Sequence, residues 1–207
     1  MKLVSGIRRI GLRNASQGFA QAAMLALLQK VFGFNTWHSK SAFHLKPYKR
    51  AVVGQVNALQ PSTILEVGCG LGDILSRLDA RGLYGLDVEP AVVRAASFLH
   101  PTLHLSVSSL AECYERCNDW GLSEIDVLLM VNWPHTLPTH ELLFELRCLT
   151  KSINVRRIVM DVIRQEASGY RFKHSADQLA RIGKVSVLAT QIDPVRDLVL
   201  VAVDPSC

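Results

Sequence analysis

The chain has 207 residues, of which 49% are hydrophobic and 20% are charged, and its formal net charge is +5. This length allows one domain with a sizeable core, and the composition excludes a disordered or low-complexity protein. Five cysteines without a paired Cys-x-x-Cys pattern argue against a zinc site and a disulfide framework, so we expect reduced cysteines, no metal and a cytoplasmic location.

The N-terminal part of the chain is basic, since no Asp or Glu occurs before Glu66. Its basic residues are Lys2, Arg8, Arg9, Arg13, Lys30, Lys40, Lys46, Lys49 and Arg50. This asymmetry favours an anionic partner, which could be nucleic acid, a membrane surface or an anionic substrate; a merely solvated basic segment is an equal alternative. Residues 16–32 are predicted to form an amphipathic helix that packs on the domain or, as the second choice, lies on a membrane surface. An organellar presequence stays open.

Predicted strands and helices alternate from Pro47 onward, where a helix over 47–59 begins. Strands are predicted over 63–67, 83–87, 103–107, 125–131 and 157–162, with helices over 72–79, 90–99, 108–119 and 139–152 between them. Ser175 is the predicted N-cap of a helix over 175–182. Segments 184–191 and 197–203 are predicted to form a closing antiparallel hairpin. The alternation predicts an α/β sheet.

The run Glu66-Val67-Gly68-Cys69-Gly70-Leu71-Gly72-Asp73 is the strongest functional signal in the sequence. Three glycines at alternate positions after an apolar strand predict a loop whose backbone a ligand approaches closely. N–H groups at the start of the predicted following helix would provide a seat for an anionic group. The spacing differs from the dinucleotide pattern Gly-x-Gly-x-x-Gly, and no Lys follows as in a Walker loop.

A second landmark is Asp87, which ends the apolar run Leu83-Tyr84-Gly85-Leu86. An acid at this strand end can accept hydrogen bonds from both hydroxyls of a ribose. Together, the glycine run and Asp87 resemble class I S-adenosylmethionine-dependent methyltransferases. The resemblance spans about residues 47–204. It implies a Rossmann-like, doubly wound, mainly parallel seven-stranded sheet with a C-terminal antiparallel hairpin, and S-adenosylmethionine as the cofactor.

Under this resemblance, residues 1–46 form a basic N-terminal helical segment or lid, and residues 47–207 form the S-adenosylmethionine-binding domain. Ligands of open α/β sheets bind beyond the carboxyl ends of the strands. The residues that we expect to bind the cofactor are Glu66, Gly68, Gly70, Gly72, Asp87, Val88, Ser108 and Asn132. Many methyltransferases have an acid after the third strand for the adenine amino group. This chain has Ser108 and Ser109, for which helix capping is an equal alternative.

The turn from Asn132 to Pro138 is the predicted reaction face, and it resembles the strand-to-loop segment of small-molecule methyltransferases. His135 is the candidate catalytic base because the ordinary pKa of histidine lies near neutrality. Trp133 is a candidate wall against the acceptor or the adenine. A surface role for His135 and a core role for Trp133 are the alternatives.

An upstream cluster of aromatic, imidazole and basic residues supplies the lid candidates His38 and Tyr48. With Tyr170-Arg171-Phe172-Lys173-His174, this cluster loosely resembles methyltransferases of polysaccharide biosynthesis. The resemblance implies O-methylation of a small molecule or saccharide. Two alternatives stay open: a nucleic-acid methyltransferase that uses the basic N-terminal segment, and a non-catalytic binding protein with this fold.

Overall fold

The computed structural model describes residues 11–204, so Lys2, Arg8, Arg9 and Cys207 lie outside the described residues. Its centre is a seven-stranded sheet in the order β3-β2-β1-β4-β5-β7-β6. The strands are β1 (Thr63–Val67), β2 (Gly82–Asp87), β3 (His104–Val107), β4 (Glu124–Met130), β5 (Asn154–Ile163), β6 (Gly183–Asp193) and β7 (Arg196–Val203). Strands β1 to β5 pair in parallel, and β7 pairs antiparallel with both β5 and β6. The predicted fold class is confirmed.

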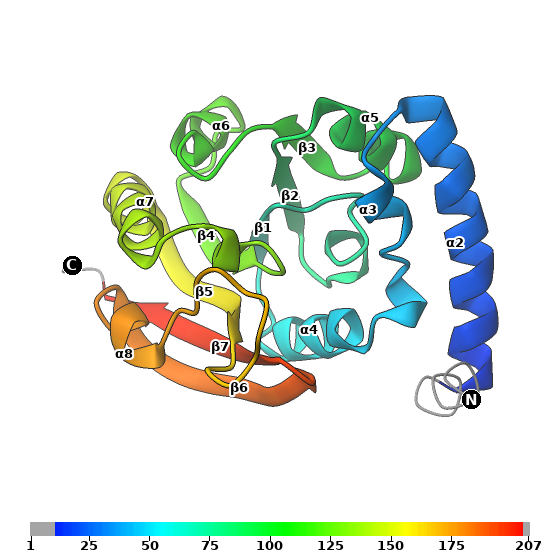
Figure 1. Ribbon diagram of the computed structural model, residues 1–207. Helices are drawn as coiled ribbons and strands as arrows, with labels where there is room; N and C mark the ends of the chain where they lie inside the picture. The colour runs from blue at the N-terminus through cyan, green and yellow to red at the C-terminus, as the bar shows by residue number, and fades with distance from the viewer. Residues whose placement is uncertain (1–10, 205–207) are drawn as a thin grey trace.

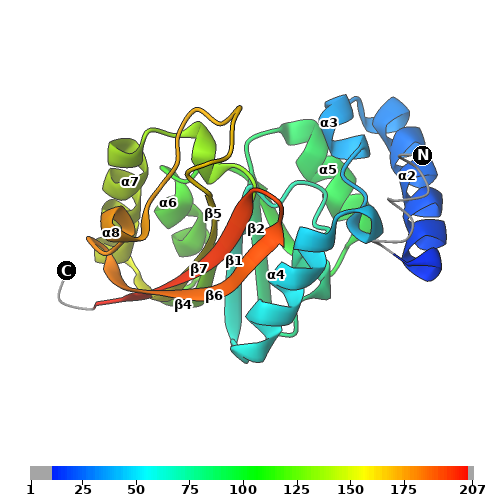
Figure 2. The same ribbon diagram turned by 60° about the horizontal axis from the view of Figure 1, so that its bottom comes forward.

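Helices cover both faces of the sheet (Figures 1 and 2). The helices of the described residues are α2 (Leu12–Phe32), α3 (Thr36–Ser39), α4 (Pro47–Ala58), α5 (Pro90–Leu99), α6 (Cys113–Asp119), α7 (Thr139–Ser152) and α8 (Ala176–Leu179). Short 3₁₀ turns are η1 (Phe43–Leu45), η2 (Leu75–Arg77) and η3 (Pro134–Thr136). Ser175 caps α8 as predicted, since its hydroxyl accepts a hydrogen bond from the Gln178 amide N–H at 3.2 Å.

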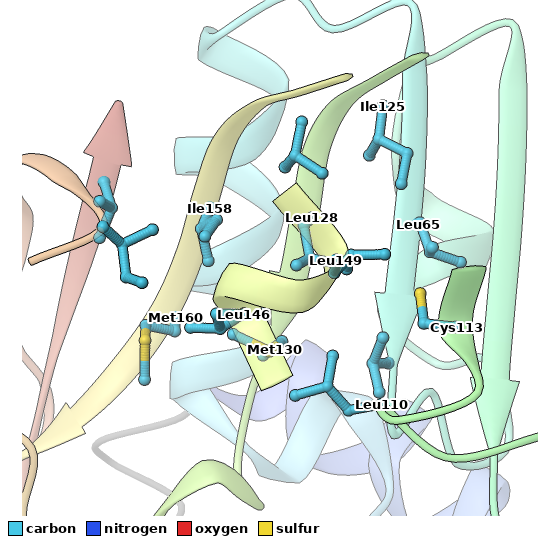
Figure 3. Packing of buried hydrophobic residues seen from close by; sticks show 14 of the residues in the cluster. Leu65, Leu110, Cys113, Ile125, Leu128, Met130, Leu146, Leu149, Ile158 and Met160 are labelled. Carbon is cyan, nitrogen blue, oxygen red and sulfur yellow. The ribbon is translucent and has the colours of Figure 1, made fainter. Parts of the chain in front are cut away.

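The core forms two layers because successive residues of a strand point to opposite faces of the sheet. On one face, the strand residues Leu65, Leu128 and Ile158 share a cluster with Leu146 and Leu149 of α7 and with Cys113 of α6 (Figure 3). On the other face, the strand residues Ile64, Val127, Leu129 and Val159 pack against α4 and η2. Burial of β1 and β4 on both faces explains their nearly continuous apolar sequences.

The N-terminal helices pack on this domain at one side of the molecule (Figure 1). Leu25 and Leu28 of α2 form a smaller core with Leu71 and with Val92 and Ala95 of α5. The preferred packing of the N-terminal helix is thus confirmed. The predicted amphipathic character of this helix is not confirmed, because the apolar residues of α2 occupy both buried and exposed positions. Whether residues 1–46 form a separate lid unit stays a prediction.

The predicted helix over 72–79 is wrong, because the structure has only the 3₁₀ turn η2 there. The Ser76 amide N–H begins a helical turn by donating to the Gly72 carbonyl oxygen at 2.9 Å. The Leu75 amide N–H instead donates to a side chain, Glu66 Oε2, at 3.1 Å. Leu78 is already extended, so no α-helix N-terminus follows the glycine run to receive an anion.

Candidate functional site

The order of the sheet reverses between β1 and β4, which pair with each other in parallel at its centre. The chain leaves β1 toward β2 on one side and leaves β4 toward β5 on the other. A crevice therefore opens outside the carboxyl ends of these two strands, where open α/β sheets bind their ligands. The glycine loop, which we define as residues 68–72, follows β1, and the predicted reaction turn follows β4.

The glycine loop is held against the neighbouring strand β2. The amide N–H groups of Gly68 and Cys69 both donate to the Leu86 carbonyl oxygen, at 2.8 and 2.9 Å. Gly68 and Gly70 have positive φ values of 74° and 55°, which only glycine adopts without strain. A Cβ atom on Gly70 would lie 3.5 Å from His38 Nδ1, so a side chain would narrow the gap between the loop and α3.

Trp133 covers the start of the glycine loop. Its indole Nε1 donates a hydrogen bond to the Val67 carbonyl oxygen at 2.5 Å. A Cβ atom on Gly68 would collide with the Trp133 ring. The absence of a side chain at Gly68 therefore permits the contact between the β1 and β4 loops, and Trp133 forms a wall of the crevice.

Replacing Gly68 with alanine is expected to lower the free energy of unfolding by about 2 kcal/mol, since the left-handed backbone is unfavourable for alanine and the Trp133 ring must shift. In a chain of this size the midpoint of thermal unfolding would fall by about 4–8 °C. Gly54→Ala is the matched control, because a Cβ atom on helical Gly54 would have no other atom within 4 Å to displace. The control should be neutral or stabilising, and equal losses in both variants would contradict the role of Gly68.

Asp87 joins the glycine loop to the carboxyl end of β2. It is a buried carboxylate, with only 7% of the residue exposed. Its Oδ2 accepts from the Gly70 amide N–H at 2.9 Å, and its Oδ1 accepts from the Glu89 amide N–H at 3.0 Å. A carboxylate oxygen has two lone pairs, so both oxygens can accept another hydrogen bond from a ligand.

A pocket of about 980 Å³ extends from this carboxylate toward the first turns of α7. It is lined by α3, the ends of β1, β2 and β4, and the segment that follows β3. Its carboxylates belong to Asp87, Glu89, Glu141 and Glu145, and none of its lining residues is Lys or Arg. The pocket is large enough for a nucleoside-sized ligand together with a second molecule, and its charged lining favours neutral or cationic groups over phosphates.

A smaller pocket of about 70 Å³ lies on the other side of the glycine loop, toward α4. The Lys49 ammonium of this pocket is buried and lies 2.9 Å from Asp73 Oδ2. It also donates to the Ser41 carbonyl oxygen at 2.6 Å, and Gln21 Nε2 donates to Asp73 Oδ1 at 2.8 Å. The buried ion pair and its hydrogen bonds thus tie together α4, α2, the segment before η1 and the residue that follows the glycine loop.

Glu66 lines this smaller pocket but lies behind the glycine loop. Burial raises the pKa of its carboxyl to about 8, although the nearby Lys49 charge and the Leu75 hydrogen bond oppose that shift. The carboxyl is therefore mostly protonated at neutral pH. A direct contact of Glu66 with the cofactor stays a prediction, since the contact seen for its carboxyl is the one that orders η2.

The other predicted cofactor residues lie around the large pocket. Val88 is 69% exposed and lines it beside Asp87, and Asn132 lines both pockets. The Asn132 amide N–H donates to Asp161 Oδ1 at 2.8 Å. Ser108 is buried at the pocket wall, but its hydroxyl donates to Glu112 Oε2 at 3.2 Å. Gly72 lines neither pocket.

The predicted lid residues differ in position. His38 lines both pockets, and its Nε2 lies 3.4 Å from Glu89 Oε2. Tyr48 lines only the smaller pocket, and burial raises the pKa of its phenol to about 12. The Arg196 guanidinium lies 4.9 Å from the centre of its ring. Tyr48 is therefore a fixed wall, whereas His38 spans the boundary between α3 and the site.

His135, the candidate base, lies in η3 and lines neither pocket. Its ring meets Tyr170 edge to face, with 4.9 Å between ring centres. Burial, followed by the nearby Arg196 and His174, lowers the pKa of His135 below its ordinary value. The imidazole is therefore mostly neutral at pH 7 and can accept a proton, although its ring does not line the pocket that would receive an acceptor.

Several lining residues were absent from the sequence prediction. They are Trp37, Lys49, Asp73, Glu89, Leu137, His140, Glu141, Phe144 and Glu145. Glu141 and Glu145 stand one turn apart at the start of a predicted helix that follows a strand end. This position in the sequence could have identified them as pocket residues.

Among residues 11–204, no group of three or more His, Cys, Asp or Glu side chains is arranged to hold a metal ion.

No protein-family model matches the chain. A segment of 46 residues is 50% identical to the Mycobacterium tuberculosis protein named "Putative methyltransferase Rv1506c". That match spans only 28% of the length of the curated relative.

Solved structures with this fold match a larger part of the chain than this relative does. The N-methyltransferase NodS from Bradyrhizobium japonicum, in complex with S-adenosylhomocysteine, is 14% identical over 86% of this chain and 97% of its own, with a TM-score of 0.60. Magnesium protoporphyrin IX methyltransferase from Synechocystis, with the same ligand bound, is 13% identical over 92% and 98%, with a TM-score of 0.57. The chain thus has the fold of class I S-adenosylmethionine-dependent methyltransferases.

Proposed function

We propose that this chain, which has the class I methyltransferase fold, binds S-adenosylmethionine and transfers its methyl group to a hydroxyl of a small molecule or saccharide. The observation that carries the proposal is the pairing of Asp87 with the glycine loop at the switch point of the sheet. The buried Asp87 carboxylate suits the hydroxyls of a ribose. The glycine backbone beside it suits the methionine portion that is attached to that ribose. The similarity to a protein named as a methyltransferase and to structures with bound S-adenosylhomocysteine supports the same ligand.

The residues of the crevice fit the parts of this cofactor. Asp87 would accept hydrogen bonds from the ribose hydroxyls, and Val88 would contact the adenine in the large pocket. Gly68 and Gly70 would let the methionine portion pass close to the backbone. The Lys49 ammonium in the smaller pocket would face the carboxylate of that portion. The acidic lining of the large pocket would suit the positive sulfonium.

When bound, S-adenosylmethionine supplies a methyl group that leaves its sulfonium as the acceptor oxygen forms the new C–O bond. The protein's main contribution is to position the acceptor in line with that bond and to exclude water. Trp133 and Leu137 would form the wall against the acceptor. We propose His135 as the base that takes the hydroxyl proton, because its lowered pKa keeps the imidazole neutral at pH 7.

This role of His135 predicts a pH dependence. Protonation of the imidazole removes the base, so kcat should be constant above about pH 7 and fall below the ordinary histidine pKa of about 6.5. The loss at pH 5.5 should be less than about tenfold, because the pKa of His135 is lowered. Steady-state rates measured from pH 5.5 to 8.5 check this. His135→Ala should abolish the acid limb, and an unchanged profile in that variant would exclude His135 as the base.

Transfer of a labelled methyl group tests the proposed activity. The full chain is incubated with methyl-tritiated S-adenosylmethionine and a panel of saccharides and small hydroxyl compounds, with RNA and duplex DNA in parallel. We expect label in the small-molecule fraction as methyl ethers. Label found only in nucleic acid would replace our proposal with the nucleic-acid alternative. Cofactor binding without transfer to any acceptor would favour a non-catalytic binding protein.

The large pocket favours the small-molecule proposal over the nucleic-acid alternative. A nucleic-acid enzyme needs Lys and Arg beside the reacting group to bind phosphates, and none lines this pocket. The basic residues of the N-terminal segment would have to bind the phosphates from outside the pocket.

The cytoplasmic location also stays a proposal, which rests on the pattern of the cysteines.

A further inference from the structure

Helix α2 exposes an apolar surface that the site does not use. We define its outer face by five residues, with exposed fractions of 80% for Leu12, 53% for Phe19, 43% for Met24, 63% for Leu27 and 68% for Val31. Met24, Leu27 and Val31 follow one another at spacings of three and four, which places them on one side of a helix. Side chains of this size are seldom gathered on the exposed side of a single helix without a partner.

The opposite side of α2 explains why the helix cannot turn this face inward. Ala15, Gly18, Leu25 and Leu28 are the buried residues of the helix. A Cβ atom on Gly18 would collide with the Leu45 side chain, so close packing fixes the rotation of α2 on the domain. The outer face therefore points away from the core, and α2 forms one side of the molecule in both overall views (Figures 1 and 2).

The apolar surface continues onto α5. Phe98 of α5 is 68% exposed, and its ring lies 5.7 Å from that of Phe32 at the end of α2. Arg94 stands one helical turn before Phe98 and is also exposed. Thus two neighbouring helices present large apolar side chains with basic residues beside them.

The charges of α2 decide between partners. The helix carries exposed Arg13 and Lys30 and no acidic residue. A second copy of the chain that offered the same face would bring basic side chains against basic side chains. An anionic lipid surface instead supplies negative headgroups for the basic side chains and hydrocarbon for the apolar ones. No helix within residues 11–204 is long and apolar enough to cross a bilayer.

We propose that the outer face of α2 docks on the surface of an anionic lipid bilayer. The helix lies in the interface, with Leu12, Phe19, Met24, Leu27 and Val31 in the boundary between headgroups and acyl chains. Trp37, which is 51% exposed and lines the large pocket, follows α2 after a short turn. Docking through α2 therefore turns the α3 end of the pocket, where Trp37 lies, toward the membrane surface, where an amphipathic acceptor would be concentrated.

Co-sedimentation of the full chain with vesicles tests this proposal. The vesicles contain phosphatidylcholine alone or with roughly one-third phosphatidylglycerol. We expect binding to the anionic vesicles that weakens with added salt. Leu27→Glu and Val31→Glu should each weaken it about tenfold or more, since each removes an apolar side chain from the interface and adds a repelled charge. Lys30→Gln should weaken it about fivefold, and only with anionic vesicles.

Val187→Glu is the matched control, because Val187 of β6 is 58% exposed and lies outside α2. Its vesicle binding should equal that of the wild type, and circular dichroism should show that all variants are folded. Equal losses in Val31→Glu and Val187→Glu, or no binding by the wild type, would overturn the proposal. So would a wild-type dimer that Leu27→Glu converts into a monomer. Lipid binding is measured without the cofactor, so its outcome is independent of the proposed function.

Discussion

Asp87→Ala is expected to weaken binding of S-adenosylhomocysteine about 100-fold, with little change in the overall fold. Each charged hydrogen bond from the carboxylate to a ribose hydroxyl contributes about 1.5–3 kcal/mol. The two bonds are not additive, and a combined loss of about 2.7 kcal/mol corresponds to that factor. The variant also frees the Gly70 amide that Asp87 now binds, which loosens the glycine loop. Isothermal titration calorimetry at constant pH and salt gives the dissociation constants of the wild type and of the variant.

Asp126→Ala is the matched control for this experiment. Asp126 is buried to the same degree as Asp87, and its Oδ2 accepts from the Ser62 amide N–H at 2.7 Å. It stands near the start of β4, at the end of the sheet opposite the crevice. Its loss should lower stability and leave the dissociation constant of the folded protein nearly unchanged. Similar affinity losses in both variants would mean that Asp87 acts through the fold and does not contact the ribose.

Lys49→Met is expected to lower the free energy of unfolding by about 3 kcal/mol. Removal of one partner from a buried ion pair leaves the other charge without compensation. Here the Asp73 carboxylate would keep only the Gln21 hydrogen bond and a more distant Arg77, whose Nη1 lies 3.9 Å from Asp73 Oδ1. The Ser41 carbonyl oxygen would also lose its donor. Urea unfolding followed by circular dichroism measures the loss.

Two further variants separate the ion pair from general effects of the substitution. Lys30→Met changes an exposed lysine of α2 and should alter stability by less than about 0.5 kcal/mol. Lys49→Met combined with Asp73→Leu removes both charges and should recover at least half of the loss. A loss below about 1 kcal/mol in Lys49→Met, or no recovery in the double variant, would contradict a stabilising role for this pair.

The central strands could be predicted closely because their sequences carry local signals. The apolar run of β1 lies between Pro61-Ser62 and Gly68, and the structure gives it the predicted bounds 63–67. α7 also has its predicted bounds, since Pro138 precedes it and its apolar residues recur with the helical period. The seven-stranded sheet with its antiparallel hairpin was implied by the resemblance, and the order of the strands comes from the structure, since strand alternation alone does not determine it.

Contacts between distant parts of the sequence account for what could not be predicted. The expected helix over 72–79 depended on Leu75 bonding along the chain, but a carboxyl nine residues earlier takes its amide N–H. Lys49 and Asp73 are 24 residues apart, and neither is unusual in its own segment. His135 occurs in the predicted turn, yet its ring packs against Tyr170, a contact 35 residues away in the sequence that the turn itself does not indicate.

The residues that would contact the adenine also could not be predicted from the sequence. Ser108 and Ser109 follow the third strand, where an acid was expected from the resemblance. The side chain of Glu112 accepts hydrogen bonds from the Ser108 hydroxyl and from the Ser109 amide N–H and hydroxyl. In these bonds the serine hydroxyls donate to Glu112, which is itself the N-cap of α6, and neither serine accepts from an N–H group of the helix, so capping by the two serines stays an alternative. The group that receives the adenine amino group stays unassigned among the lining residues.

Calorimetric titration of the wild-type chain with S-adenosylhomocysteine is the most direct test of our central claim, which is that the crevice beside the glycine loop holds this cofactor. We predict saturable binding of one ligand per chain that NAD and ATP do not displace, because the loop lacks both the dinucleotide spacing and the Walker lysine. Absence of binding, or displacement by NAD or ATP, would contradict the claim.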